Sequence, residues 1–317
     1  MKIIIPGGTG EVGQVLIKWF RDLQHDVVVL SRSQEGTGPH GERLLQWDGK
    51  TPGPYFDHID GADAIINLAG RSVNCRYTKE NLRQMMDSRV DSTRVIGRAI
   101  AAAENPPPVW LQMSTATIYA HRFDAPNDEH RGIIGGDEPD VPDYWAYSVE
   151  IAQAWEAAQQ EADTPSTRKV ALRTAMVMSP TPDSVFGVLC GLTRKGLGGA
   201  IAGGDQYVSW IHEEDFARAV HFLLDHDLEG PVNLASPSPL PQREHMATLR
   251  DALGISVGLP AAAWMVRLGA VFLRTDAELV LKSRRVIPGR LTDAGFAFRY
   301  PRWEDAAPEL VRRLSDS

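Results

Sequence analysis

A short apolar run, a glycine-rich loop and an amphipathic helix pattern follow one another within residues 1–23. Ile3-Ile4-Ile5 is typical of a buried strand. The loop Gly7-Gly8-Thr9-Gly10-Glu11-Val12-Gly13 comes next, and apolar side chains then recur at helical spacing at Val12, Leu16, Trp19, Phe20 and Leu23. This order predicts a βαβ unit, and therefore a parallel sheet that begins at the first residues.

The loop contains two overlapping glycine patterns, Gly-x-Gly-x-x-Gly from Gly8 and Gly-x-x-Gly-x-x-Gly from Gly7. Such a triplet is weak by itself, but here it follows a strand and opens a helix. Glycines permit a tight turn and let backbone N–H groups approach a pyrophosphate, while the helix N-terminus adds partial positive charge. We therefore expect the whole loop to bind the phosphates of a dinucleotide. The alternative is a tight strand-to-helix turn without a ligand.

Further apolar runs alternate with helical patterns along the chain. The runs predict strands at 27–30, 43–46, 64–68, 109–113, 170–172 and 232–234. The helical patterns cover 79–103, 144–161 and 242–253, and the first of them stops before the prolines at 106–108, which cannot continue a helix. Strands that alternate with helices predict an α/β fold of Rossmann type with a doubly wound parallel sheet.

Composition and charge limit the possible partners of the 317-residue chain. It is 43% hydrophobic and has a formal net charge of −8, which argues against broad attraction to nucleic acid or an anionic membrane. Cys75 and Cys190 lie far apart without metal-ligand spacing, which favours a reducing compartment and no metal site. No apolar run approaches the roughly 20 residues of a membrane helix, and no signal-peptide pattern is present. We expect a cytoplasmic or organellar-matrix protein whose oligomeric state is open, with a homodimer among the options.

The residues after the second predicted strand bear on the choice of cofactor. An NAD enzyme usually places an acidic residue there for the ribose hydroxyls, whereas an arginine suits a 2′-phosphate. This chain has Ser31-Arg32-Ser33, a guanidinium between two hydroxyls, which can cradle a phosphate. The sequence therefore favours NADP(H) over NAD(H). A solvated surface arginine is the alternative.

Two more strand ends are candidates for cofactor contacts. Asp48 follows the third strand, where adenine is commonly contacted, although a loop aspartate without that role is equally consistent with the sequence. Asn67-Leu68-Ala69-Gly70 ends the fourth strand, and its small residues would let the backbone lie against the cofactor ribose and phosphate. A plain turn toward the next helix is the alternative for this second stretch.

Several stretches resemble the extended and atypical short-chain dehydrogenase/reductase superfamily, and more narrowly its epimerase family of NAD-dependent epimerase/dehydratase-like oxidoreductases. They are Asn67-Leu68-Ala69-Gly70, Ser88-Arg89-Val90, Gly198-Gly199, Trp210-Ile211-His212-Glu213-Glu214-Asp215, Gly230-Pro231-Val232-Asn233-Leu234, Arg285-Val286-Ile287-Pro288 and Gly295-Phe296-Ala297-Phe298. The resemblance covers nearly the whole chain and implies NADP(H) binding and a small C-terminal lobe. We expect the Rossmann domain over residues 1–235, with 180–204 reaching into a substrate lobe over residues 236–317.

The resemblance also implies where chemistry would take place. In that superfamily a strand-end Ser or Thr and a Tyr-x-x-x-Lys pair carry the hydride reaction, and the lysine lowers the pKa of the tyrosine. Ser114-Thr115-Ala116-Thr117-Ile118-Tyr119 resembles the Ser-Ser-Ala-x-Val-Tyr stretch of extended members. This likeness places Thr115 at the catalytic hydroxyl and Ser114 among the cofactor-binding residues. Strand-end hydroxyls that only satisfy backbone groups are the alternative.

The tyrosine–lysine pair is absent from this chain. Tyr144 is followed four residues later by Ser148 and Tyr147 by Ile151, and the helix contains no lysine. Trp155-Glu156 resembles the helix of the narrower family, which also tends to lack the pair. Tyr147 stays a candidate acid, with a tyrosine packed in the wall of the cleft as the alternative.

Other polar residues have weaker signals. Arg173 ends the sixth strand, where the resemblance implies contact with the nicotinamide end of the cofactor, and a structural ion pair is the alternative. His212 and Asp215 resemble a His-x-x-Asp segment that caps a helix and braces the lobe. His121 and Arg122 are either substrate contacts or a solvated loop pair. The C-terminal arginines suggest a solvated face, formed by Arg284, Arg285, Arg290, Arg299 and Arg302. The apolar residues before them suggest the core of the lobe, formed by Trp264, Val266, Leu268 and Phe272.

The leading hypothesis is an NADP(H)-binding oxidoreductase or epimerase-like enzyme for a small carbonyl or hydroxyl compound. Thr115 would orient a substrate oxygen, and Tyr147 or a water in the cleft would complete proton transfer. The missing lysine motivates a second hypothesis, a non-catalytic NADP(H)-binding regulator. A nucleotide-sugar epimerase is a third, weakened because that chemistry relies on the absent tyrosine–lysine pair.

Overall fold

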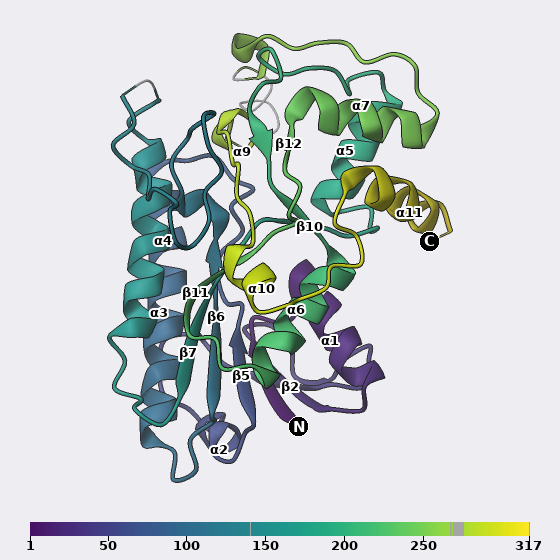
Figure 1. Ribbon diagram of the computed structural model, residues 1–317. Helices are drawn as coiled ribbons and strands as arrows, with labels where there is room; N and C mark the ends of the chain where they lie inside the picture. The colour runs from purple at the N-terminus through teal and green to yellow at the C-terminus, as the bar shows by residue number, and fades with distance from the viewer. Residues whose placement is uncertain (140, 267, 269–275, 317) are drawn as a thin grey trace.

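The computed structural model describes residues 1–139, 141–266, 268 and 276–316 and is built around one eight-stranded sheet (Figure 1). The strand order is β11-β7-β6-β5-β1-β2-β4-β3, and every pairing is parallel except that of β3 with β4. The strands are β1 (Lys2–Pro6), β2 (Asp26–Ser31), β3 (Gly36–Thr37), β4 (Arg43–Gln46), β5 (Ala64–Asn67), β6 (Val109–Thr115), β7 (Arg168–Thr174) and β11 (Gly230–Leu234). The order reverses between β1 and β5, so the predicted Rossmann-type sheet is confirmed.

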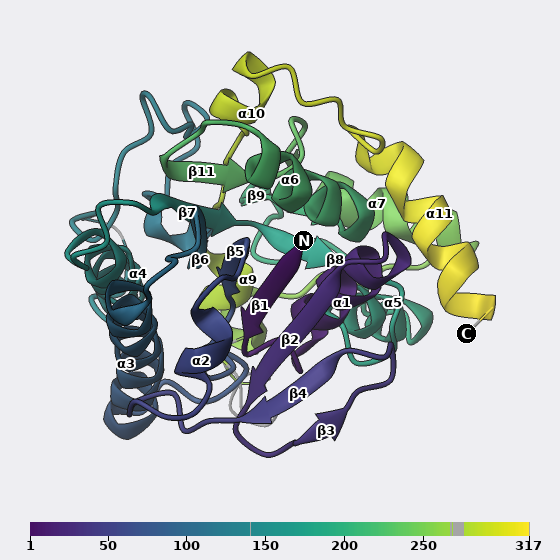
Figure 2. The ribbon, with the colours of Figure 1, turned by 90° about the horizontal axis from the view of Figure 1, so that it is seen from below.

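Helices cover both faces of the sheet (Figures 1 and 2). On one face α1 (Glu11–Asp22) and α6 (Glu213–Asp225) pack on each other and on β1, and they share a core that includes Phe20 and Phe216. On the other face α3 (Lys79–Ala102) packs with the short α2 (Phe56–Ile59), and α4 (Trp145–Gln160) lies along α3. The central strands β1, β2, β5, β6 and β7 are therefore buried on both sides, which explains their continuous apolar runs, whereas β3 at the edge is exposed.

The helix ends follow from local signals. The Thr78 hydroxyl caps α3 by accepting the Asn81 N–H (3.2 Å), and the helix stops at Ala102, before the three prolines. Helix α1 ends at Asp22, one residue earlier than its apolar pattern suggested. Leu23 is its C-cap and is 45% exposed, so its predicted place on the buried face is wrong.

A second, smaller core lies beside the sheet. It joins α5 (Val185–Arg194), α7 (Gln242–Leu253) and α11 (Trp303–Asp316) to two short strand pairs. One pair is β8 (Met176–Met178) with β10 (Trp210–His212), and the other is β9 (Tyr207–Val208) with β12 (Leu240–Pro241). These strands are two or three residues long, too short to leave a periodic pattern. The predicted domain division at residue 235 stays a prediction.

The apolar residues expected to form the lobe core are not all inside. Trp264 is 66% exposed and Leu268 is 51% exposed, so the prediction is wrong for both, and Phe272 lies outside the described residues. The core is filled instead by Trp210 and Trp303, whose rings meet edge to face at 4.9 Å. Helical spacing predicts which residues share a face, but not whether another element covers that face. No helix in the described part of the chain combines the length and apolar character that a membrane crossing requires.

The second core also holds a buried histidine. His245 stacks on Trp303 with ring centroids 4.2 Å apart, and its carbonyl accepts the Trp303 indole N–H (2.9 Å). Its Nε2 has no hydrogen-bond partner among the described residues. Burial lowers the pKa of His245 to about 3, because protonation would place an unpaired charge in an apolar core.

Acidification from about pH 7.5 to about pH 5 should therefore lower the free energy of unfolding by about 2 kcal/mol through His245. The unfolded chain protonates this ring below pH 6.5, whereas the folded chain does so only near pH 3, so stability that is complete above pH 6.5 is lost as the pH falls. Denaturant unfolding at both pH values measures the effect. His245→Phe keeps the ring stacking and should remove this share of the pH dependence, whereas His40→Phe, at an exposed ring, is the control. An unchanged pH dependence in His245→Phe would refute the assignment.

Candidate functional site

The glycine loop after β1 is closed by two backbone contacts that tolerate no side chain. A Cβ on Gly13 would lie 2.2 Å from the Gly8 carbonyl oxygen, and a Cβ on Gly7 would lie 2.7 Å from the Ala69 Cα. Gly7 also has a φ of +76°, which disfavours other residues. A Cβ on Gly10, by contrast, would meet nothing nearer than 3.8 Å. Two glycines of the triplet are thus required by the fold, and the third leaves open space.

That open space faces the start of α1. Gly10 is the N-cap residue, and no side chain caps the helix. The first-turn N–H groups of Glu11, Val12 and Gly13 have no acceptor among the described residues, and neither has the N–H of Thr9. Unpaired N–H groups at the positive end of a helix dipole form an anion site. The loop therefore fits a pyrophosphate.

A cavity of about 580 Å³ adjoins the ends of β2 and β4, and Arg32, Gln46, Trp47 and Tyr55 are among the residues that line it. The Arg32 guanidinium has no partner within the described residues. The cavity and the glycine loop share one edge of the sheet, because the Gly7 N–H donates to the carbonyl of Leu30 on β2 (2.9 Å). Ser31 is buried, and its hydroxyl accepts the N–H of the exposed Ser33 (3.4 Å).

The Asp48 carboxylate lies at the same cavity but binds its own loop. It accepts the N–H groups of Lys50 and Thr51 (both 2.8 Å) and the Thr51 hydroxyl (2.7 Å). The bonds from Thr51 and Lys50 hold the pKa of Asp48 at about 2, so this carboxylate is charged at neutral pH. Its contact with adenine stays a prediction, while its role in shaping the loop is visible.

A buried pair of side-chain amides, Asn67 and Gln112, holds the end of β5 in place. Asn67 donates to the Gln112 side chain (2.9 Å), and its Oδ1 accepts the Ala69 N–H (3.1 Å). The Leu68 N–H donates to the Pro6 carbonyl (2.9 Å), which holds residues 68–69 against the glycine loop. Gly70 follows at the surface. Residues 67–70 thus form the wall next to Gly7.

Thr115 and Ser114 end β6 at the same edge of the sheet, with different surroundings. The Thr115 Oγ1 accepts the Thr117 N–H (3.1 Å), and the residue is half-buried. The Ser114 hydroxyl donates inward to the Glu156 carboxylate (2.6 Å) on α4. Because the Thr115 hydroxyl accepts that bond, its own proton remains available to another acceptor.

Arg173 belongs to the buried network that Ser114 enters. Its guanidinium makes a two-pronged pair with Glu156 (2.8 and 2.9 Å) and donates to the Tyr119 hydroxyl (3.0 Å). Tyr119 in turn donates to Asn233 on β11 (2.9 Å). Burial alone would lower the pKa of Arg173, but Glu156 raises it above its usual range. The ion pair foreseen as the alternative is present, and a cofactor contact by Arg173 or Ser114 stays a prediction.

Tyr147 lies on the part of α4 that turns toward α3. It packs, half-buried, against the small apolar cluster of Leu82, Met85 and Ile151. Tyr147 lines neither of the two cavities described in this section, and both its role as an acid and its place in a cleft wall stay predictions.

The side chains that place positive charge next to the end of β6 come from the C-terminal part of the chain, not from α4. Lys282, which follows α9 (Glu278–Leu281), is buried and donates to the Thr117 carbonyl (3.1 Å), with its Nζ 3.8 Å from Glu278 Oε1. The Arg284 Nε donates to the Thr117 hydroxyl (3.0 Å). The Ser148 hydroxyl of α4 donates to Glu278 (2.6 Å). Sequence reasoning missed Glu278 and Lys282, and the solvated face expected at Arg284 is wrong.

Residues 282–287 are hydrogen-bonded along both edges, and we call them the C-terminal strap. On one side the Asn127 N–H donates to Arg285 O (2.6 Å) and Ile287 N donates to Asn127 O (3.0 Å). On the other side Arg284 N donates to Tyr207 O (2.9 Å) and Val286 N donates to the Ser209 hydroxyl (2.8 Å). The C-terminal strap therefore links the loop after β6 to the strands of the second core.

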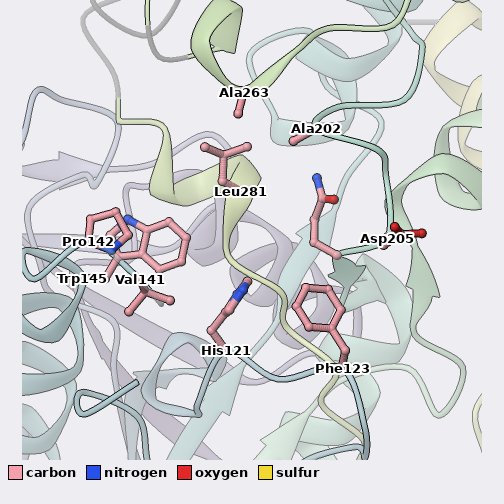
Figure 3. Close-up of a pocket in the computed structure, with 10 residues that line it drawn as sticks. His121, Phe123, Val141, Pro142, Trp145, Ala202, Asp205, Ala263 and Leu281 are labelled. Carbon is pink, nitrogen blue, oxygen red and sulfur yellow. The ribbon is translucent and has the colours of Figure 1, made fainter. Parts of the chain in front are cut away.

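A second cavity, of about 290 Å³, lies beside the C-terminal strap (Figure 3). Most of the lining residues have apolar side chains, among them Phe123, Val141, Pro142, Trp145, Ala202 and Leu281, and the polar lining residues are His121, Asp205 and Gln206. His121 Nδ1 accepts the Ser283 N–H (2.7 Å). Arg122, its neighbour, pairs with the exposed Asp124 (2.6 Å), so the expected solvated pair describes Arg122 and not His121.

The predicted bracing role of His212 and Asp215 is confirmed. His212 is the N-cap of α6, where its Nδ1 accepts the Glu214 N–H (3.1 Å), and its Nε2 meets Glu309 of α11 (2.9 Å). The buried Asp215 accepts the N–H groups of Arg299 and Tyr300 (both 2.8 Å). Both residues tie α6 to the C-terminal segment.

Known proteins resemble the chain along its whole length. The human epimerase family protein SDR39U1 is 29% identical, with 98% of this chain and 100% of that protein covered. The epimerase family protein YfhF of Bacillus subtilis is 28% identical, with 98% of each covered. The crystal structure of human SDR39U1 (isoform 2) with NADPH superposes with a TM-score of 0.84 at 28% identity, covering 98% of this chain and 99% of that one.

Two family models match in succession. The second covers residues 261–310 and describes a domain of unknown function, DUF1731. The first covers residues 3–235, from β1 to the end of β11, and describes the NAD dependent epimerase/dehydratase family. With the glycine loop, the reversal of strand order and the Thr115 strand end all inside that match, the chain belongs to the NAD dependent epimerase/dehydratase family.

Proposed function

We propose that the chain is an NADPH-dependent oxidoreductase that acts on a small carbonyl compound. One observation carries the cofactor part, namely unpaired N–H groups at the start of α1 next to a cavity that holds the unpaired Arg32. The human relative that was crystallised with NADPH, at a TM-score of 0.84, supports the same assignment.

The residues fit the three parts of this cofactor. The loop from Gly7 to Gly13 would hold the pyrophosphate with backbone N–H groups. Arg32 would pair with the 2′-phosphate, because a guanidinium presents paired donors to phosphate oxygens. The cavity beside Trp47 would bind the adenosine. Residues 67–70 would lie against the cofactor ribose and phosphate. The bound cofactor would supply a hydride at the carboxyl edge of the sheet.

Thr115 is the proposed contact to the substrate oxygen. Its hydroxyl already accepts the Thr117 N–H, so its proton can be donated to a carbonyl at the strand end. Lys282 binds the carbonyl of Thr117, and Arg284 binds its hydroxyl. The positive charge of both side chains would favour the negative charge that develops on the substrate oxygen during reduction. Tyr147 or a water in the cleft would deliver the proton that completes reduction.

The cavity beside the C-terminal strap weighs against a nucleotide-sugar substrate. A nucleoside diphosphate sugar carries a pyrophosphate, and among the residues that the structure describes neither arginine nor lysine lines this 290 Å³ space. A regulator that binds NADPH without turnover is the second candidate, because α4 contains no lysine. NADPH consumption with any member of a carbonyl panel would decide for the enzyme. Tight NADPH binding without turnover, together with partners that change with NADPH in a pull-down, would decide for the regulator.

Arg32→Ala should lower the affinity for NADPH by about 10- to 100-fold, because a charge-assisted contact to the 2′-phosphate is lost. The affinity for NADH should hardly change. Calorimetric titration of both nucleotides against wild type and variant measures this, with Arg302→Ala at an exposed ion pair as the control. Equal losses for NADH and NADPH would show that Arg32 does not contact the 2′-phosphate.

Gly10→Ala and Gly13→Ala should separate binding from folding. Alanine at Gly10 meets no clash within the protein, so its stability should change by less than about 1 kcal/mol, while NADPH affinity falls about tenfold or more because the methyl group stands where the phosphate would lie. Alanine at Gly13 would collide with the Gly8 carbonyl and should cost roughly 1–3 kcal/mol of stability or prevent folding. Thermal unfolding and NADPH titration test both variants. Normal NADPH affinity in Gly10→Ala would contradict the phosphate site.

Thr115→Val should lower kcat/KM about 100-fold for any carbonyl that the wild type reduces, with little change in NADPH affinity. Thr115→Ser keeps the hydroxyl and is the matched control, expected within about tenfold of wild type. The readout is NADPH absorbance under steady-state conditions. Equal activity of the valine and serine variants would remove Thr115 from the mechanism.

A further inference from the structure

The cavity beside the C-terminal strap is built around His121. The imidazole projects between Phe123 and Trp145 and faces Leu281 across the space (Figure 3). Both aromatic rings meet it edge to face, with centroids 5.0 Å away for Phe123 and 5.5 Å for Trp145. These two rings, one from the loop after β6 and one at the start of α4, therefore hold the imidazole in one orientation.

The C-terminal strap determines which ring nitrogen of His121 carries the proton. Nδ1 accepts the Ser283 backbone N–H at 2.7 Å. A backbone N–H can only donate, so Nδ1 is unprotonated and the neutral ring has its proton on Nε2. Burial, with Lys282 and Arg284 nearby, also lowers the pKa of His121, which favours the neutral form. The Nε2–H has no acceptor among the described residues.

The other polar groups of the cavity are already engaged. Asp205 forms an ion pair with Arg243. The Gln206 amide donates to the carbonyls of Ile201 (3.1 Å) and Val280 (3.3 Å). Lys282 does not line the space and is held by Thr117 and Glu278. Within the described part of the chain, a charged ligand would therefore lose its hydration without gaining an unpaired partner of opposite charge.

We propose that this cavity, which Thr115 does not line, binds an uncharged molecule with one hydrogen-bond-accepting oxygen at a place separate from the proposed Thr115 contact, and that this oxygen accepts the His121 Nε2–H. A ketone or an aldehyde with an apolar body has this chemistry. The site does not rest on the proposed oxidoreductase function. His121 supplies the hydrogen bond to the oxygen, the desolvation cost in the cavity disfavours a charged ligand, and Ser283 maintains the tautomer that leaves the Nε2–H free to donate.

Three matched probes test the class of ligand in the full-length protein. They are 4-phenyl-2-butanone, 3-phenylpropionate and 3-phenylpropanol, which share a phenylalkyl body and carry a ketone, a carboxylate and a hydroxyl. Ligand-observed NMR titration should show binding of the ketone, and weaker binding of the carboxylate by about tenfold or more. The alcohol, which also offers an acceptor oxygen, should bind within about tenfold of the ketone. Stronger binding of the carboxylate than of the ketone would overturn the proposal.

Two variants separate the ligand contact from the support of the C-terminal strap. His121→Gln places an N–H donor near the position of Nε2 and should bind the ketone within about threefold of wild type. His121→Asn keeps an acceptor near Nδ1 for the Ser283 N–H but lacks the distal donor, so it should keep the thermal stability and lose about tenfold in ketone affinity. Equal ketone affinities in the two variants, with both folded, would exclude His121 as the contact.

The tautomer has its own spectroscopic readout. Histidine-selective ¹⁵N NMR distinguishes a protonated from a bare ring nitrogen, and His121→Gln identifies the His121 signals by their loss. We expect a protonated Nε2 and a bare Nδ1, with Nε2 shifting on addition of the ketone. A proton on Nδ1 would contradict the proposal. NADPH titration of the same samples distinguishes the proposed NADPH-dependent function from the ligand site at His121. Ketone binding without NADPH binding would reject the proposed function and retain this site.

Discussion

Close approach of backbone to backbone at two glycines is the constraint on which this structure depends. Gly13 allows the first turn of α1 to lie on the Gly8 carbonyl, and Gly7 allows β1 to lead into a turn against Ala69 at the end of β5. These contacts set the position of α1 on the sheet and the width of the crevice where the strand order reverses. The unpaired N–H groups of α1 face a ligand because the loop packs this way.

The C-terminal strap has the corresponding role on the other side of the crevice. Its two hydrogen-bonded edges join the loop after β6 to the strands of the second core, and its side chains enter the site. Lys282 and Arg284 bring positive charge to Thr117, where the helix α4 has none. The Ser283 N–H fixes the ring of His121. The positive charge that α4 lacks is therefore supplied at Thr117 by residues more than a hundred positions later in the chain.

Sequence reasoning succeeded where the relevant forces are local. The buried strands, the Thr78-capped helix and the glycine loop all have patterns that short-range packing and backbone geometry produce. It failed at Leu23, where a helix ended one residue before its pattern, and at Trp264 and Leu268, whose side chains no described element covers. It also missed Glu278 and Lys282. Isolated charged residues in an irregular segment have no periodicity, so nothing in the sequence indicates that they are buried.

The sequence by itself determined the class of fold, the place of the phosphate loop and the arginine that follows the second strand. Each of these depends on residues within one βαβ unit, where spacing along the chain and position in space are tightly related. Only the tertiary structure decided that Arg173 is held by Glu156 and that His121 faces a cavity. These outcomes depend on contacts between segments far apart in the chain, and burial and hydrogen-bond partners exist only once those segments have packed.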